Sequence, residues 1–436
     1  MSEITTYEKT KDSGIEWIGS VPSHWRVHTL YQLVTQVKEK NSNLQEKNLL
    51  SLSYGKIKRK DIDSPDGLLP ASFDGYNIIE DGDIVLRLTD LQNDHTSLRV
   101  GLATERGIIT SAYTTLRPID TSNSKYLYYL LHAFDLKKGF YGMGSGVRQG
   151  LNYAEVKELR VVLPGQDEQN AIVRFLDNQC GQIDSIIEEA KSSIEEYKKW
   201  RSILIFEAIT KGIDPNVEKK DSGIKQIGQI PIHWDCCSLK FLTTKIGSGK
   251  TPSGGAEVYT NSGIMFLRSQ NIYDSGLILQ DVSFISSEID EEMKNTRVQY
   301  NDILLNITGG SIGRCCVYTL KDVPANVNQH VCIIRTQSEK LLPQFLRYFW
   351  NSSAGTMSVG LYQTGGNRPG LNFEQIGSTK VPVCSLQEQQ RIVEYLDKIT
   401  AEIDKLIIEK QNLTTDMENY KRSLTYEVIS GKRKVV

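Results

Sequence analysis

The sequence predicts an α+β protein that is built twice: two similar mixed α/β domains separated by two long helices, which form an antiparallel coiled coil with an internal pseudo-twofold. Two observations predict this fold. Stretches of the first half return in the same order in the second half, which indicates a duplicated domain. Two long segments also carry apolar residues at alternating steps of three and four, the spacing of a coiled-coil seam.

Three repeated segments align the two copies: residues 11–25 with 220–234, 146–152 with 366–372, and 168–177 with 388–397. The distance between matching positions grows along the chain, so the second copy holds about ten more residues, in the interval after its His-Trp pair. Domains that keep a scaffold and diverge in one interval are expected to recognise different things. A pseudo-twofold protein suits two half-sites or two copies of one partner.

Long helices are predicted for residues 166–212 and 386–436. Neither helical seam contains proline, and Gly212 and Gly431 stand where C-terminal caps belong. A helix of this length with one bare apolar stripe needs a partner. The simplest partner is the other helix of the same chain, and a homodimeric coiled coil is the alternative. The residues expected to pair the helices are Leu176, Ile183, Ile187, Ile194, Leu396, Ile403, Leu406, Leu413 and Leu424, with Arg201 interrupting the first seam.

The mixed domains are predicted at residues 1–165 and 213–385. Apolar runs bounded by turn residues predict matching strands at 83–89 and 302–308, and again at 114–117 and 332–335. Short amphipathic helices are expected at 126–134 and 344–350.

Composition limits the classes of function. The N-terminus is polar and no run approaches a membrane helix, so we expect a cytoplasmic protein. Seven cysteines without a C-x-x-C pair predict free thiols. The formal net charge is −2, whereas a protein that binds nucleic acid alone is usually basic. A basic surface would therefore be local, or a partner would supply part of it.

Catalytic motifs are missing from the sequence. Gly247-Ser-Gly-Lys-Thr251 lacks the spacing and the preceding strand of a phosphate loop. Glu155 and Lys157 have the spacing of some metal nucleases, but the second copy has Gln375 and Gly377 there, which favours a solvated helix turn. The six histidines show no metal-ligand spacing. We expect no catalytic residue and no metal site.

Nucleic-acid signals are stronger. Four cations fall within residues 56–60, and Lys245 and Lys250 flank a glycine-rich turn; such groups neutralise phosphates, although a solvated surface run is the alternative. Arg148 and Arg368 share one repeat position and suit a phosphate or base contact, or a salt bridge. The DNA-binding candidates are Lys56, Lys58, Arg59, Lys60, Arg87, Arg148, Gln149, Lys245, Lys250, Arg268, Gln270, Asn271, Asn306, Thr308, Arg314, Asn367 and Arg368.

The ordered set of motifs resembles the specificity subunit of Type I restriction–modification systems, often called HsdS. The motifs are the Asp-Ser-Gly-Ile to His-Trp entry at 12–25 and 221–234, the segments 266–272 and 302–314, and the Glu-Gln-x-x-Ile-Val opening at 168–177 and 388–397. The resemblance covers nearly the whole chain. Residues 40–76 and their counterpart depart from it, in an interval where members differ in target.

The resemblance implies target-recognition domains at 1–165 and 213–385, and spacer helices at 166–212 and 386–436. Each domain would read one half of a bipartite, asymmetric site in double-stranded DNA, and the helices would set the spacer. The chain would be non-catalytic and hold no cofactor. Two methyltransferase (HsdM-type) subunits and restriction/translocase (HsdR-type) subunits would bring S-adenosylmethionine, ATP and Mg2+, methylating adenine or cutting DNA.

Two other classes of function stay open at this point. One is an enzyme: either a stand-alone nuclease, against which the absence of a catalytic constellation argues, or the recognition part of a fused methyltransferase–nuclease, against which two complete recognition repeats argue. The other is a coiled-coil scaffold with no role on DNA, which would fail to retain DNA even with a methyltransferase partner.

Overall fold

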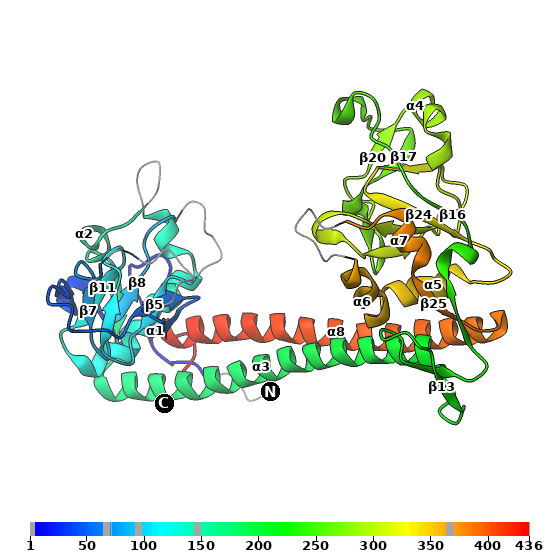
Figure 1. Ribbon diagram of the computed structural model, residues 1–436. Helices are drawn as coiled ribbons and strands as arrows, with labels where there is room; N and C mark the ends of the chain where they lie inside the picture. The colour runs from blue at the N-terminus through cyan, green and yellow to red at the C-terminus, as the bar shows by residue number, and fades with distance from the viewer. Residues whose placement is uncertain are drawn as a thin grey trace. The chain divides into compact units, whose positions relative to one another are not determined.

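The chain divides into two compact units. The computed structural model describes residues 5–63, 70, 72–91, 98–143, 150–362 and 370–435. Unit 1 comprises Met1–Lys191 with Gln411–Val436, and unit 2 comprises Ser192–Lys410. The helices α3 (Gln166–Lys211) and α8 (Leu386–Ile429) are continuous through these limits, so each unit holds one mixed domain and a segment of both long helices (Figure 1).

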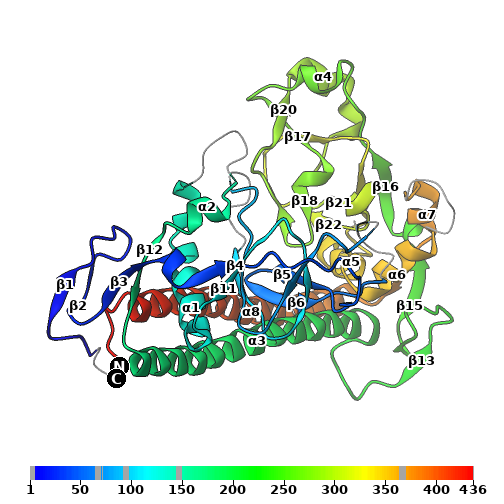
Figure 2. The ribbon, with the colours of Figure 1, turned by 90° about the vertical axis from the view of Figure 1, so that its left-hand side faces the viewer.

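The mixed domain of unit 1 consists of short strands and two helices. The strands are β1 (Thr10–Asp12), β2 (Ser20–Pro22), β3 (Arg26–Thr29), β4 (Val34–Gln36), β5 (Leu50–Ser53), β6 (Lys56–Arg59), β7 (Asn77–Ile79), β8 (Ile84–Leu86), β9 (Val100–Leu102), β10 (Gly107–Ile109), β11 (Thr114–Pro118) and β12 (Arg160–Leu163); the helices are α1 (Ser124–Leu136) and α2 (Tyr153–Val156). Figure 2 shows α1 against the long helices, and side chains of α1, α3 and α8 share one apolar core.

The mixed domain of unit 2 has more elements. The strands are β13 (Lys219–Asp221), β14 (Gln229–Pro231), β15 (Asp235–Ser238), β16 (Thr243–Ser248), β17 (Ile264–Leu267), β18 (Ile272–Tyr273), β19 (Gly276–Leu277), β20 (Ser283–Ile285), β21 (Ile303–Asn306), β22 (Cys315–Val317), β23 (Ala325–Val327), β24 (Val331–Thr336) and β25 (Lys380–Val383); the helices are α4 (Ser287–Glu292), α5 (Pro343–Trp350), α6 (Ser353–Leu361) and α7 (Phe373–Ser378). In the interval with the additional residues, β17 and β20 join β23 in one sheet, and β18 pairs with β19.

A four-stranded antiparallel sheet is the common scaffold of both units. Its strand order is β4-β11-β8-β9 in unit 1 and β16-β24-β21-β22 in unit 2. An arginine on the second strand forms two hydrogen bonds with a buried aspartate before the third strand: Arg117 with Asp83, and Arg335 with Asp302. The predicted strands exist, although β8 and β21 are shorter than the apolar runs 83–89 and 302–308: each begins one residue later, after the aspartate, and also ends earlier.

The entry motif of each copy anchors the start of one long helix. Nε2 of His24 donates a hydrogen bond of 2.8 Å to Glu168 of α3, and Nε2 of His233 donates one of 3.0 Å to Glu388 of α8. A carboxylate in the first turn of a helix is also favoured by the helix dipole. These histidines and glutamates therefore join each mixed domain to the helix that follows it.

The long helices run antiparallel in each unit. In unit 1 Cys180 of α3 contacts Thr425 of α8, and Asp184 contacts Lys421. In unit 2 Arg201 of α3 contacts Asp404 of α8. In these three pairs, each later residue of α3 contacts a residue that lies earlier in α8 by the same number of positions. The antiparallel coiled coil of the predicted fold is confirmed, and it forms within one chain.

Most of the predicted pairing residues are buried, and two are not. Leu176, Ile183, Ile187, Ile194, Leu396, Ile403 and Leu424 are at most 8% exposed. Leu413 is only partly buried, and the expectation for Leu406 is wrong, since 37% of it is exposed. Near Leu406 the helices meet through the polar pair Arg201–Asp404, and polar contacts there replace the apolar seam.

Each long helix ends on a glycine in the left-handed conformation. Gly212 has φ +74° and lies beside Trp234, and Gly431 has φ +69° and lies beside Trp25. A side chain at either position would be strained, so the caps expected from the sequence are present. Among the described residues, no helix is long and apolar enough to cross a membrane.

Candidate nucleic-acid interface

One edge of the four-stranded sheet in unit 2 gathers several of the predicted residues. Strands β16 and β21 end at this edge, and β24 and β22 begin there. The nitrogen of Gly249 donates to the carbonyl of Asn328, and the nitrogen of Asn306 donates to the carbonyl of Arg314. Lys250, Thr308 and Arg314 therefore come from loops that meet at one edge.

Thr308 lies at the centre of this edge with a histidine that the sequence did not single out. The hydroxyl of Thr308 is 2.6 Å from Nδ1 of His330, and Nε2 of His330 is 3.0 Å from Gln329. Gln329 is exposed. His330 immediately precedes β24, the strand that pairs with β21. Its position directly before a predicted strand is the sequence feature that could have marked it as a site residue.

Gly249 holds the Lys250 loop close to the neighbouring backbone. A Cβ atom on Gly249 would collide with the carbonyl oxygen of Val327. Lys250 itself is exposed. The glycine therefore allows the loop to pass directly over the start of β24, with an exposed lysine next to it.

Asn271 and Asn306 hold loops in place. Both are fully buried. Nδ2 of Asn271 donates to the carbonyl of Ile278, while its Oδ1 accepts from the nitrogen of Arg268. Nδ2 of Asn306 donates to the carbonyl of Ser269. The prediction that these two amides are available to DNA is wrong, because backbone groups engage them and no solvent reaches them.

Arg268, Gln270 and Arg314 are more accessible than the two asparagines. Gln270 is exposed, and both arginines are partly buried. The guanidinium of Arg268 lies over the ring of Tyr259, and that of Arg314 lies over the ring of Tyr273. Stacking of this kind orients a guanidinium without using all of its donors, so both arginines keep groups for a ligand.

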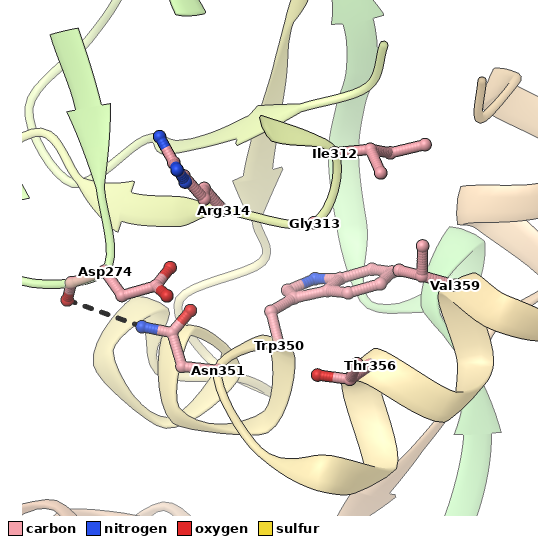
Figure 3. A pocket seen from close by; sticks show the side chains of 8 residues that line it. All are labelled: Asp274, Ile312, Gly313, Arg314, Trp350, Asn351, Thr356 and Val359. Atoms are coloured by element: carbon pink, nitrogen blue, oxygen red, sulfur yellow. Dashed lines mark hydrogen bonds between the residues drawn. The ribbon is translucent and has the colours of Figure 1, made fainter. Parts of the chain in front are cut away.

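Arg314 also lines a small hollow beside α5 and α6. Figure 3 shows it with Asp274, Asn351 and Thr356 around the hollow, and with the indole of Trp350 below Gly313. Nδ2 of Asn351 donates to the carbonyl of Asp274 at 3.5 Å. The hollow presents donors and an acceptor beside the apolar side chains of Ile312, Trp350 and Val359, so its lining is mixed.

Lys245 lies away from this edge. It lies on the edge strand β16 and pairs with Arg335 near the C-terminal end of β24, and its Nζ donates to the carbonyl of Asn295. Burial, and then the charge of Arg335, lowers the pKa of Lys245. These contacts make Lys245 a structural lysine and separate it from Lys250.

Unit 1 builds the same edge with different side chains. Arg87, at the end of β8, occupies the position of Asn306, and its nitrogen donates to the carbonyl of Arg99. Arg99 precedes β9 as Arg314 precedes β22, but Arg99 is fully buried. Its guanidinium donates to the carbonyls of Arg87, Thr89 and Asp90. Arg99 therefore holds in place the segment that carries Arg87. Its position before a strand in the sequence gave no indication of this structural role.

Arg148, Gln149, Asn367 and Arg368 lie outside the described residues. The residues that follow them are placed, however. The nitrogen of Leu151 donates to the carbonyl of Leu88, and the nitrogen of Leu371 donates to the carbonyl of Ile307. The same contact is thus made twice, at the ends of β8 and β21. Both repeat arginines are followed within a few residues by a segment that is bonded to the sheet edge.

The basic run of unit 1 forms strand β6. Lys56, Lys58, Arg59 and Lys60 are all exposed. Arg59 forms an ion pair with Glu105, which lowers the pKa of that carboxyl, and Lys56 lies 4.0 Å from Asp184. In the described part of the chain, no three His, Cys, Asp or Glu side chains cluster as metal ligands.

Comparisons with known proteins add independent evidence. Residues 231–413 match the Type I restriction modification DNA specificity domain. The chain is 26% identical over 324 residues to the EcoBI specificity subunit of Escherichia coli (72% of this chain, 66% of the relative), and 25% identical over 313 residues to the MjaVIII specificity subunit of Methanocaldococcus jannaschii (70% of each). The chain is similar to Type I restriction specificity subunits over most of its length, in agreement with the resemblance carried by the sequence motifs.

Solved structures support the fold of this chain. A chain from a type I R-M system aligns with a TM-score of 0.71 and 13% identity, covering 94% of this chain and 98% of the other. The HsdS subunit from Thermoanaerobacter tengcongensis aligns with a TM-score of 0.51 at the same identity and coverage. The predicted fold class is confirmed.

Proposed function

We propose that this chain reads a bipartite, asymmetric site in double-stranded DNA, one half with each mixed domain. The observation that carries the proposal is a sheet edge built twice with different groups. The scaffold pairs Asp83–Arg117 and Asp302–Arg335 are the same in both units. Where unit 1 ends its third strand with a partly buried Arg87, unit 2 has the buried Asn306. One scaffold with two sets of loops suits two different half-site sequences.

The chemistry of the edge in unit 2 suits DNA. Lysine and arginine provide positive charge for phosphates, and glutamine, threonine and histidine provide donors and acceptors for base edges. Lys250, Gln270 and Gln329 are exposed there. Because the formal net charge of the chain is −2, these cations act locally, and a partner subunit supplies further contacts to the backbone of DNA.

The two long helices set the spacer between the half-sites in this proposal. α3 has 46 residues, which corresponds to about 69 Å at 1.5 Å per residue. Insertion of about one helical turn into α3, with a matching insertion in α8, is expected to lengthen the unread spacer and to leave both half-site sequences unchanged. An unchanged spacer in the methylated motif would contradict this role.

Two methyltransferase subunits are the partners in this proposal, and restriction subunits join them; S-adenosylmethionine, ATP and Mg2+ belong to those partners. Repeated apolar residues on the helices support two equivalent docking places. Ile186 and Leu406 share one repeat position, and Trp200 and Tyr420 share another; their exposed fractions are 40%, 37%, 46% and 45%. Unit 1 holds Ile186 with Tyr420, and unit 2 holds Trp200 with Leu406. Exposed apolar groups that recur in this way are expected at interfaces.

A base-resolution methylome tests the proposal. The methyltransferase encoded beside this chain is expressed in a methylation-free host, with and without the chain. A split adenine-methylated motif that requires the chain is the expected result, and it gives both half-sites. A soluble complex that produces no motif would contradict sequence-specific recognition and favour a scaffold.

A further inference from the structure

The β5–β6 hairpin of unit 1 has two different faces. Its strands pair antiparallel, with Ser53 opposite Lys56 and Ser51 opposite Lys58. Leu50 and Leu52 are buried in a small apolar cluster against which Ile57 packs. Side chains alternate between the faces of a strand, so Lys56 and Lys58 lie on the face opposite Ile57. The nitrogen of Lys60 donates to the carbonyl of Leu49, which extends the ladder and places Lys60 on the same face.

The outward face carries cations that have few partners. Arg59, on the inward face, is engaged by Glu105 through its Nε at 2.8 Å. Lys56 is 4.0 Å from Asp184. Lys58 and Lys60 form no ion pair with any described carboxylate, and both are exposed. Two free lysines, spaced by one residue on one strand face, therefore remain for a ligand.

An aromatic side chain stands at the tip of the hairpin. The turn consists of Tyr54 and Gly55, with φ of +48° and +77°, as in a type I′ turn. Tyr54 is 76% exposed. Gly55 lies beside Leu98 and the carbonyl of Val100, the first residue of β9, and β9 begins at the sheet edge that carries Arg87. The tip of the hairpin is therefore close to the candidate DNA-binding edge.

We propose that this hairpin is a two-stranded ribbon that lies in a groove of DNA at one half-site, with Lys58 and Lys60 on backbone phosphates and Tyr54 directed toward the bases. The proposal rests on the DNA-reading function proposed above. A two-stranded β-ribbon fits the major groove. An outward face of lysine and serine suits phosphates better than a protein, because lysine is depleted at protein–protein interfaces.

Only one half-site should depend on the hairpin. The interval of unit 2 that replaces it contributes β17 and β20 to a sheet with β23, and forms the pair β18-β19. The hairpin also explains which members of the basic run act on DNA. Lys58 and Lys60 do so, whereas Arg59 holds the hairpin to Glu105.

The test uses the complex of the full chain with its methyltransferase and a duplex that carries the methylated motif. The double variant Lys58→Gln/Lys60→Gln removes both free cations. Binding is measured at several salt concentrations. We expect affinity to fall on the order of tenfold at physiological salt, and the slope of log affinity against log salt to decrease by about 0.9 for each lost phosphate contact.

A matched control comes from the other hairpin of unit 1. Lys9 and Lys11 are exposed and are likewise spaced by one residue, at β1. The variant Lys9→Gln/Lys11→Gln removes the same charge from the same unit, and its affinity and salt slope should stay near those of the unaltered chain. Equal losses in both double variants would show a general charge effect and overturn the proposal.

The variant Tyr54→Ala tests the tip of the hairpin. We expect its methylome to show relaxed base preference in one half-site, with the other half-site unchanged. Unaltered preference at both half-sites, together with an unaltered salt slope in the lysine variant, would overturn the proposal while the split motif itself persists. Loss of the methyltransferase from the lysine variant during gel filtration would instead assign the hairpin to a protein contact. A wild-type complex without any split motif would contradict the proposed function itself.

Discussion

The ammonium group of Lys421 lies 2.6 Å from a carboxylate oxygen of Asp184, which joins α8 to α3 in unit 1. The same contact occurs in unit 2, where Nε of Arg201 lies 3.0 Å from Asp404. Asp184 and Asp404 share one repeat position, and Arg201 and Lys421 share another. The cation that interrupts the apolar seam is thus the partner of an acid on the other helix, and duplication of one pair orients both helix segments.

The contribution of this pair to stability should be small and measurable. A double-mutant cycle with Asp184→Ala and Lys421→Ala is expected to give a coupling free energy of about 0.3–1 kcal/mol, because both side chains are partly exposed. The cycle Arg201→Ala with Asp404→Ala serves as the matched measurement in unit 2. Urea-induced unfolding provides the free energies. A coupling free energy near zero in both cycles would mean that the apolar seam alone orients α3 and α8.

The buried pair of each sheet should contribute more. Asp83 is only 2% exposed, and it accepts two hydrogen bonds from Arg117, whose pKa it raises. Asp83→Asn removes the charge and leaves the guanidinium of Arg117 without its counter-ion. We therefore expect the free energy of unfolding to fall by about 2–3 kcal/mol. This loss is below the range for fully buried ion pairs because Arg117 is partly exposed.

Asp302→Asn is the matched change in unit 2, where Arg335 donates to a carboxylate that is 1% exposed. Calorimetry of both variants should show that each lowers the unfolding temperature of its own unit more than that of the other. Losses below about 0.5 kcal/mol in both would mean that the neutral amide satisfies the arginine equally well.

The sequence was sufficient for the features that repeat. The two long helices and the matching strands follow from periodicity and from duplication. Pairing within one chain was the favoured of two alternatives, and the contacts between α3 and α8 decide for it. Leu406 could not be assigned correctly, because heptad spacing alone does not say where polar contacts replace the seam. The element pattern of the divergent interval was also beyond the sequence, since the two copies offer no alignment there.

The candidate site was predicted less well than the fold. Asn271, Asn306 and Lys245 have side chains that suit DNA, and the structure uses all three for backbone contacts. Residue type reports what a group can bind, whereas burial decides what it does bind. His330 was missed because its role depends on Thr308, a neighbour that is distant in sequence.

Gly249 should matter for DNA binding because it sets the position of the loop that carries Lys250. In Gly249→Ala the new methyl group would meet the carbonyl of Val327, so the loop that carries Lys250 must move away from the start of β24. We expect several-fold weaker binding to one half-site in a duplex-binding assay. Gly247→Ala is the control, because a Cβ atom there meets nothing within 4 Å. Equal affinity in both variants would show that the position of the Lys250 loop is unimportant.

His132 should make unit 1 sensitive to acid. The ring stacks on Tyr128, and its Nδ1 is buried without a hydrogen-bond partner among the described residues. Burial, and then the charge of Lys421, lowers the pKa of His132 to about 4. Between that value and the usual pKa of about 6.5, the unfolded chain holds a proton that the folded chain has released. The stability gained from neutral His132 is therefore complete above about pH 6.5 and is lost as the pH falls toward 4.

The variant His132→Asn separates this effect from other titrations, since Asn351 holds the equivalent position in unit 2. Carboxylates titrate in both proteins and cancel in the comparison. Each proton linked in this way changes the free energy of unfolding by at most about 1.4 kcal/mol per pH unit. We expect the free energy of unfolding, measured with urea, to decrease from pH 7 to pH 5 by about 1–2 kcal/mol more in the unaltered chain than in the variant. Parallel losses would mean that His132 accepts a proton in the folded chain without cost, and that water or a local rearrangement supplies the partner which Nδ1 lacks.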